Sequence, residues 1–199
     1  MTHHKHHHHH HHRHNGVSHF VHHLLHPKHE NATPAATTAP SAPHTVNEAA
    51  LKSEGFNSRS IGLLRHVDGK LERLVEETGR VLRQEGLHIE MQITQGFRTA
   101  REQLECYKRG ASKCDGYRFR SNHQSGRAID YSLYQNGEYL TGDDAASEAK
   151  YSKVAAAFKT AAHRLGYNIE WGGDWRKFKD NDHIEIARRQ PTARGPAMA

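Results

Sequence analysis

Two short stretches of this 199-residue chain carry side chains that must meet in space, and this requirement constrains the fold more than any other feature. They are residues 121–130, SNHQSGRAID, and residues 180–183, DNDH. A catalytic zinc takes three protein ligands from His, Asp, Glu or Cys and leaves a fourth position open. His123, Asp130 and His183 form such a set for one Zn²⁺ ion. Because 6 and then 52 residues separate them, they converge only if the strands that carry them are neighbours.

A zinc site that hydrolyses its substrate also needs a carboxylate that is not a ligand, to take a proton from water at the metal. Asp180 lies three residues before His183 and is the candidate for this base. Alone, each of these residues would be read as a surface histidine or a strand-end acid. Their joint spacing is what predicts a metal site.

Apolar periodicity predicts three helices in the folded part of the chain. One should span residues 60–83, because its apolar residues recur at spacings of three and four. Thr99 and Glu102 form a capping-box pattern, so a second helix should run from 99 to about 108. The alanine-rich segment 145–165 should be the third, ended by Gly166.

The remaining pattern predicts short strands. Residues 89–93 alternate between apolar and polar, and Asn136-Gly137 is a hairpin signal that should pair strand 128–133 with 138–140. Further strands are expected at 168–170 and 183–186, and residues 110–124 read as a long loop. The sequence therefore predicts an α+β fold in which helices pack on a small antiparallel sheet that carries the zinc.

Composition divides the chain into a tail, a domain and a second tail. Of the 21 histidines, 16 lie between His3 and His44, and residues 32–43 are almost entirely Ala, Thr, Pro and Ser. Such a segment buries too little apolar surface to offset its ordering entropy. We expect residues 1–47 to be disordered, 48–187 to form the zinc-binding hydrolase domain, and 188–199 to be a flexible tail. The histidines fit either an expression tag or a natural metal-collecting segment.

The charge pattern gives no sign of a nucleic-acid partner. The formal net charge of +6 is modest and spread along the chain, and no basic stripe with interleaved aromatics stands out. No apolar run reaches the roughly 20 residues of a membrane span, and no signal-peptide pattern opens the chain. We expect a monomer that is synthesised as a soluble cytoplasmic protein and delivered to wherever its substrate lies.

Cys106 and Cys114 are the only cysteines. No further Cys or His pattern accompanies them, which argues against a structural zinc site. A disulfide would form in an oxidising compartment, whereas two free thiols are the default in the cytoplasm.

At these motifs the chain resembles the D-Ala-D-Ala metallopeptidase family, which includes carboxypeptidases, dipeptidases and phage L-alanyl-D-glutamate endopeptidases. The family pattern Ser-x-His-x-x-Gly-x-Ala-x-Asp is matched by residues 121–130, and acid-x-x-His by residues 180–183. Two further segments, QGFRT at 95–99 and WGGDW at 171–175, are similar to the phage endopeptidase branch. The resemblance covers about residues 55–187.

The resemblance implies a zinc peptidase acting on the stem peptide of peptidoglycan, at the cell wall or periplasm. It implies that Arg98 faces the negative charge that develops on the carbonyl oxygen. Ser121 would hydrogen-bond the substrate or a metal ligand. Trp171 and Trp175 would form either an apolar wall of the cleft or part of the core.

Three other functions fit parts of the pattern. A close variant would cut D-Ala-D-Ala instead. A non-catalytic binding module, like the zinc-containing signalling domain of hedgehog proteins, would keep the ligands, but Asp180 argues against it because a structural zinc needs no free carboxylate. Metal storage by the histidine-rich tail would be a side role at most.

Overall fold

A computed structural model describes residues 45–187 of the chain. The expected tails fall almost entirely outside these residues. Val46 is already buried, and Asn47 caps the first helix, α1 (Glu48–Ser53), by accepting from the Ala50 amide. No helix within residues 45–187 is long and apolar enough to cross a membrane.

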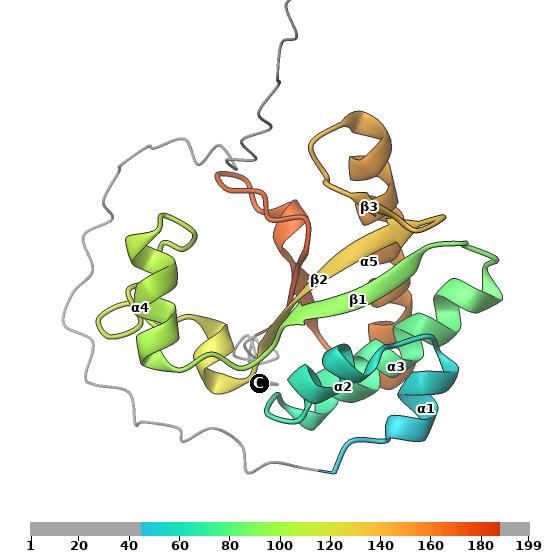
Figure 1. Cartoon of the computed structure of the whole chain (residues 1–199), viewed down its shortest axis with the longest axis horizontal. Coiled ribbons are helices and arrows are strands. Elements are labelled where there is room, and N and C mark those ends of the chain that lie inside the picture. The colour runs from blue at the N-terminus through green and yellow to red at the C-terminus, as the bar shows by residue number, and fades with distance from the viewer. Residues whose placement is uncertain (1–44, 188–199) are drawn as a thin grey trace, which may run out of the picture. The chain divides into compact units, whose positions relative to one another are not determined.

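The predicted α+β architecture is confirmed: an antiparallel sheet with helices packed on it (Figure 1). The strands are β1 (Glu90–Gln95), β2 (Ala128–Gln135), β3 (Glu138–Leu140), β4 (Ile169–Trp171) and β5 (His183–Ile186), in the order β1-β2-β5-β4. The short β3 pairs with the far end of β2 through the expected Asn136-Gly137 turn, in which both residues have positive φ.

The long helix expected over 60–83 is instead two helices, α2 (Ser58–Leu64) and α3 (Gly69–Gln84). The apolar period continues through Val67, which is fully buried, but the backbone breaks beside it. Asp68 caps α3 by accepting from the Lys70 amide, and its own amide donates to the Gly126 carbonyl at 2.7 Å. These two bonds replace a continuous helical ladder at this point.

The other predicted helices are found at their expected places. α4 (Ala100–Lys108) begins at Thr99 with the full reciprocal capping box. α5 (Ala145–Leu165) begins at Asp144 and ends at Gly166, whose φ of 68° is left-handed.

The core lies between the sheet and the helices α3 and α5. The faces of α3 and α5 that pack inward bury apolar side chains at helical spacing, among them Leu71, Leu74, Val154 and Phe158. On β2, alternate residues Ile129, Tyr131 and Leu133 point into this core. Asp130 therefore points to the opposite face, because side chains alternate along a strand.

Candidate metal centre

The pairing of β2 with β5 brings two of the expected ligands together. Asp130 lies directly opposite His183 in this antiparallel pair, and His183 Nδ1 is 2.9 Å from Asp130 Oδ1. Ile184 and Ile186 of β5 point into the core. His183 and Glu185 therefore share the opposite face with Asp130.

The third ligand comes from the turn that precedes β2. His123 lies in the 3₁₀ helix η1 (Asn122–Ser125), which Ser121 and Gln124 cap reciprocally. Gly126 then takes a left-handed φ of 66°, and a Cβ there would lie only 2.8 Å from the His66 carbonyl oxygen. This glycine lets the chain turn from η1 into β2 against the backbone of residues 66–68.

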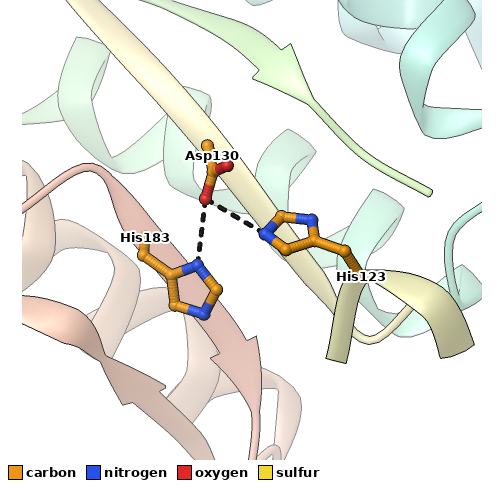
Figure 2. A group of neighbouring side chains, drawn as sticks. All are labelled: His123, Asp130 and His183. Atoms are coloured by element: carbon orange, nitrogen blue, oxygen red, sulfur yellow. Dashed lines mark hydrogen bonds and ion pairs between the residues drawn. The ribbon is translucent and has the colours of Figure 1, made fainter. Parts of the chain in front are cut away.

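Figure 2 shows that one oxygen of Asp130 faces both imidazoles, with His123 Nε2 at 3.2 Å and His183 Nδ1 at 2.9 Å. The three ligand atoms lie within 4.8 Å of one another. His123 is 3% exposed and His183 6%, whereas the Asp130 side chain is 22% exposed, so water reaches the group mainly at Asp130.

In each ring, the nitrogen that faces away from Asp130 (the outer nitrogen) lies next to a hydrogen-bond acceptor. His123 Nδ1 is 2.8 Å from the Gly96 carbonyl oxygen, and His183 Nε2 is 3.0 Å from Glu185 Oε2. A carbonyl and a carboxylate can only accept, so each outer nitrogen carries a hydrogen. If a metal were bound, both rings would be neutral and their inner lone pairs would bind the ion, which is the arrangement typical of metal-ligating imidazoles.

The electrostatics of the site favour positive charge. Although burial opposes ionisation, the charge and hydrogen bonds of His123 and His183 hold the pKa of Asp130 well below its usual range. Burial also opposes protonation of His183, but hydrogen bonds to Asp130 and Glu185 raise its pKa to about 10. A divalent cation would satisfy the same negative surroundings in place of the proton. The donor set of two imidazoles and a carboxylate therefore fits a metal.

Arg98 lies at this centre, as expected. Its Nη2 is 3.6 Å from Asp130 Oδ2, and its Nη1 donates to Gln103 Oε1 at 2.8 Å. The side chain is only 11% exposed, and its Nε has no hydrogen-bond partner among residues 45–187. The guanidinium is thus fixed at two nitrogens and keeps a donor unused.

Asp180 lines a cleft together with the three candidate ligands, and the backbone around it is tightly held. Its amide donates to the Gly172 carbonyl, and a Cβ on Gly172 would meet the Asp180 carbonyl oxygen at 2.4 Å. Asn181 is fixed as well, because its carbonyl accepts from Trp171 Nε1 at 2.8 Å and from the Tyr131 hydroxyl at 3.0 Å. Core side chains therefore set the position of the Asp180 turn.

Asp182 neighbours Asp180 and has an unusual ionisation. Burial, a hydrogen bond with the Asp180 side chain and the charge of Asp130 raise the pKa of Asp182 well above its usual range. The two carboxyl groups therefore form a hydrogen-bonded acidic pair beside the metal ligands.

The three candidate ligands, Arg98 and Asp180 line one cleft of about 240 Å³. The loop 111–114 lines it together with Arg120 and Ser121, and so do Trp175, Phe178 and Asp180. The Trp175 ring lies 5.1 Å from that of His183. Trp171 does not line this cleft: it is 9% exposed and belongs to the core, so it acts on the site only through the Asn181 carbonyl.

The remaining expected residues fall outside the metal centre. Cys106 and Cys114 are free thiols, and burial is the main cause that raises the pKa of Cys114. Ser121 lines the cleft, but its hydroxyl accepts from the His123 amide, so it also builds the turn that carries the ligand.

Sequence reasoning missed Glu185, Asp182 and Gln103. Glu185 could have been found, because a residue two places from a ligand on a strand shares its face. Gln103 is fully buried and binds Arg98, which no local pattern indicates.

Known peptidases are similar to this chain. The curated relatives include the peptidoglycan L-alanyl-D-glutamate endopeptidase CwlK of Bacillus subtilis, 34% identical over 108 residues, 49% of this chain and 61% of the relative. The L-alanyl-D-glutamate peptidase of Listeria phage A118 is 33% identical over 98 residues, 49% of this chain and 31% of the relative. The chain thus matches less than two thirds of the length of either relative.

A solved structure is also similar, that of the L-Ala D-Glu endopeptidase ChiX of Serratia marcescens. The TM-score is 0.55 at 27% sequence identity, covering 68% of this chain and 92% of that one. The family model of the phage L-alanyl-D-glutamate peptidases matches residues 53–195, well over half of the chain. The chain therefore belongs to the phage L-alanyl-D-glutamate peptidase family.

Proposed function

We propose that this protein is a zinc-dependent peptidoglycan peptidase that hydrolyses the amide bond between L-Ala and D-Glu of the stem peptide. The observation that carries the proposal is the meeting of His123, Asp130 and His183 with Asp180 and Arg98 in one cleft. Membership of the family supplies the bond that is cut. All of these groups come from one chain, so a monomer suffices, acting where its wall substrate lies.

Zinc suits this set of ligands better than magnesium or calcium, which prefer oxygen donors throughout. When bound by His123, Asp130 and His183, the ion would supply a Lewis acid that polarises the scissile carbonyl and lowers the pKa of water. The protein's own groups would do the rest.

Asp180 would take the proton from the attacking water and return it to the leaving nitrogen of D-Glu. Arg98 would stabilise the negative charge that builds on the carbonyl oxygen, because its guanidinium is held by Gln103 before the substrate arrives. The apolar side of Trp175 would exclude water from one flank of the bound peptide.

The proposal is tested by digesting purified peptidoglycan with the zinc-loaded wild type and with Asp180→Ala, and identifying the products by mass. We expect new amino-terminal D-Glu from the wild type and none from Asp180→Ala, while zinc stays bound to both. Asp143→Ala is the matched control, because Asp143 is an exposed acid that does not line the cleft.

Other results would favour other functions. Release of terminal D-Ala without new D-Glu amino termini would point to a D-alanyl-D-alanine carboxypeptidase. A wild type that binds zinc and cuts no bond of the stem peptide would point to a non-catalytic binding module.

A further inference from the structure

The cleft carries two cations that the proposed chemistry does not use. Lys113 and Arg120 both line it. Among residues 45–187, neither side chain forms an ion pair or a hydrogen bond, and both residues are exposed. The acids of the cleft, Asp130, Asp180 and Glu185, lie at the metal end, so the charge of the cleft is divided.

Lys113 lies against an aromatic ring of the cleft. Its Nζ is 5.6 Å from the centroid of the Phe178 ring, and Phe178 also lines the cleft. A cation held against an aromatic face keeps its full charge, unlike one neutralised by a carboxylate. The ammonium is therefore positioned over the cleft and still able to bind an anion.

The loop that carries both cations is built as a fixed wall. The buried Gln103 amide donates to Ser112 Oγ at 2.7 Å and to the Cys114 carbonyl at 2.8 Å. Gln124 Nε2 donates to the Gly116 carbonyl at 2.8 Å. Asp115 accepts from the amides of residues 117 and 119 at 2.9 and 2.8 Å. Since its polar groups are satisfied within the protein, the loop presents its cations from a preorganised backbone.

The proposed substrate offers one anion in reach of such a wall. In an L-Ala-D-Glu bond the glutamate nitrogen is the leaving group, and glutamate has two carboxyl groups. At most one continues the stem peptide, so the other is free and negatively charged. It belongs to the same residue as the nitrogen that leaves, so it stays within the cleft when the scissile bond lies at the metal ligands.

We propose that Lys113 and Arg120 form a subsite for the free carboxylate of the D-Glu residue, and that this subsite selects glutamate over its amidated form. The inference rests on the proposed function. A carboxylate bound by charged donors gains more than a carboxamide of the same shape, which cannot form an ion pair. The subsite would also orient the peptide, with its carbonyl toward the metal ligands and its anion toward the loop.

The test uses the full zinc-loaded chain and two synthetic peptides that differ only in their D-Glu residue, which has a free carboxylate in one and a carboxamide in the other. We expect the wild type to show a kcat/KM roughly 10- to 100-fold higher for the carboxylate peptide, as charged hydrogen bonds provide. Lys113→Gln and Arg120→Gln should each lower this ratio, and the double variant should bring it to about 1. Lys113→Arg should retain it.

Arg118→Gln is the matched control, because Arg118 is an exposed cation of the same loop that does not line the cleft. Its ratio should equal that of the wild type. A wild-type ratio of about 1, or a ratio that the double variant leaves unchanged, would overturn the subsite alone. Failure of the wild type to cut either peptide at the Ala-Glu bond would overturn the proposed function and the subsite with it.

Discussion

Asp130 and His183 face each other across the β2–β5 pair, and one carboxylate oxygen of Asp130 lies within 3.2 Å of ring nitrogens from both His183 and His123. A cross-strand pair of this kind fixes the distance between two ligands through the backbone. The metal centre is therefore defined by strand register, and a shift of one residue in β5 would turn His183 into the core.

Asp130→Asn tests how far the centre depends on this carboxylate. The amide has the same size as the carboxylate but no charge. Replacing a residue that only supports a metal ligand typically weakens metal binding by 10- to 100-fold. Because Asp130 would itself be a ligand, the zinc Kd of Asp130→Asn should rise by more than that. The zinc Kd, measured by competition with a chromophoric chelator, checks this. Asp174→Asn, which alters an exposed acid paired with Lys159, should leave the Kd unchanged. Tight zinc binding by Asp130→Asn would remove Asp130 from the ligand set.

Glu185→Gln tests the carboxylate that holds the outer nitrogen of His183. Glu185 Oε2 lies 3.0 Å from His183 Nε2, and the hydrogen bond orients the ring and increases its basicity. We expect the zinc Kd to rise by roughly 10- to 100-fold for Glu185→Ala and by less for Glu185→Gln, which keeps an acceptor. Glu138→Gln, an exposed acid on β3, serves as the control. If zinc affinity is unaffected in both Glu185 variants, the ring is held by its strand alone.

Much of this arrangement follows from the sequence. The period-2 pattern locates β1, the hairpin turn locates β2 and β3, and the caps at Thr99 and Gly166 locate α4 and the end of α5. These signals depend only on neighbours in the chain. The break between α2 and α3 at residues 65–68 could not be predicted from the sequence, since it depends on a hydrogen bond between Asp68 and the distant Gly126. For the same reason the sequence could not say whether Trp171 faced the cleft or the core.

Comparing Gly126→Ala with Gly166→Ala separates two structural reasons for a glycine, a left-handed φ and a lack of space for a Cβ. Gly126 and Gly166 both end a helix in the left-handed region, with φ of 66° and 68°. An added Cβ meets nothing within 4 Å at Gly166 but lies 2.8 Å from the His66 carbonyl oxygen at Gly126. Gly166→Ala should cost only the conformational penalty of roughly 1–2 kcal/mol of unfolding free energy.

Gly126→Ala should cost more than Gly166→Ala and should also weaken zinc binding, because the backbone shift displaces His123. Denaturant unfolding of the two variants, with the zinc Kd of each, makes the comparison. Equal losses of stability and unchanged zinc affinity would mean that only φ matters at Gly126.

Trp171→Phe and Tyr131→Phe test how the core holds the Asp180 turn. Both side chains donate to the Asn181 carbonyl, so each single variant leaves one donor in place. We expect each to cost about 1 kcal/mol of unfolding free energy. The double variant should cost more than the sum, since it leaves the carbonyl without either donor. It should also lower kcat more than it changes the zinc Kd. Simple additivity would show that the two donors act independently.

Arg98→Ala tests the group assigned to the developing oxyanion. Because the guanidinium is held by Gln103 and lies beside Asp130, Arg98 should stabilise the transition state more than the bound substrate. We expect kcat to fall by roughly 10²- to 10³-fold with KM changed only a few-fold. Arg98→Lys should recover part of the loss, because it restores the charge but not the planar set of donors.

Zinc content must be measured for each Arg98 variant, since Arg98 also contacts a ligand. Arg101→Ala is the matched control, because Arg101 is exposed on α4 and does not line the cleft. A rise in KM at constant kcat would assign Arg98 to ground-state binding of the peptide. Loss of zinc at unchanged kcat per bound ion would instead make Arg98 a support for Asp130, and the oxyanion would then need another donor in the cleft.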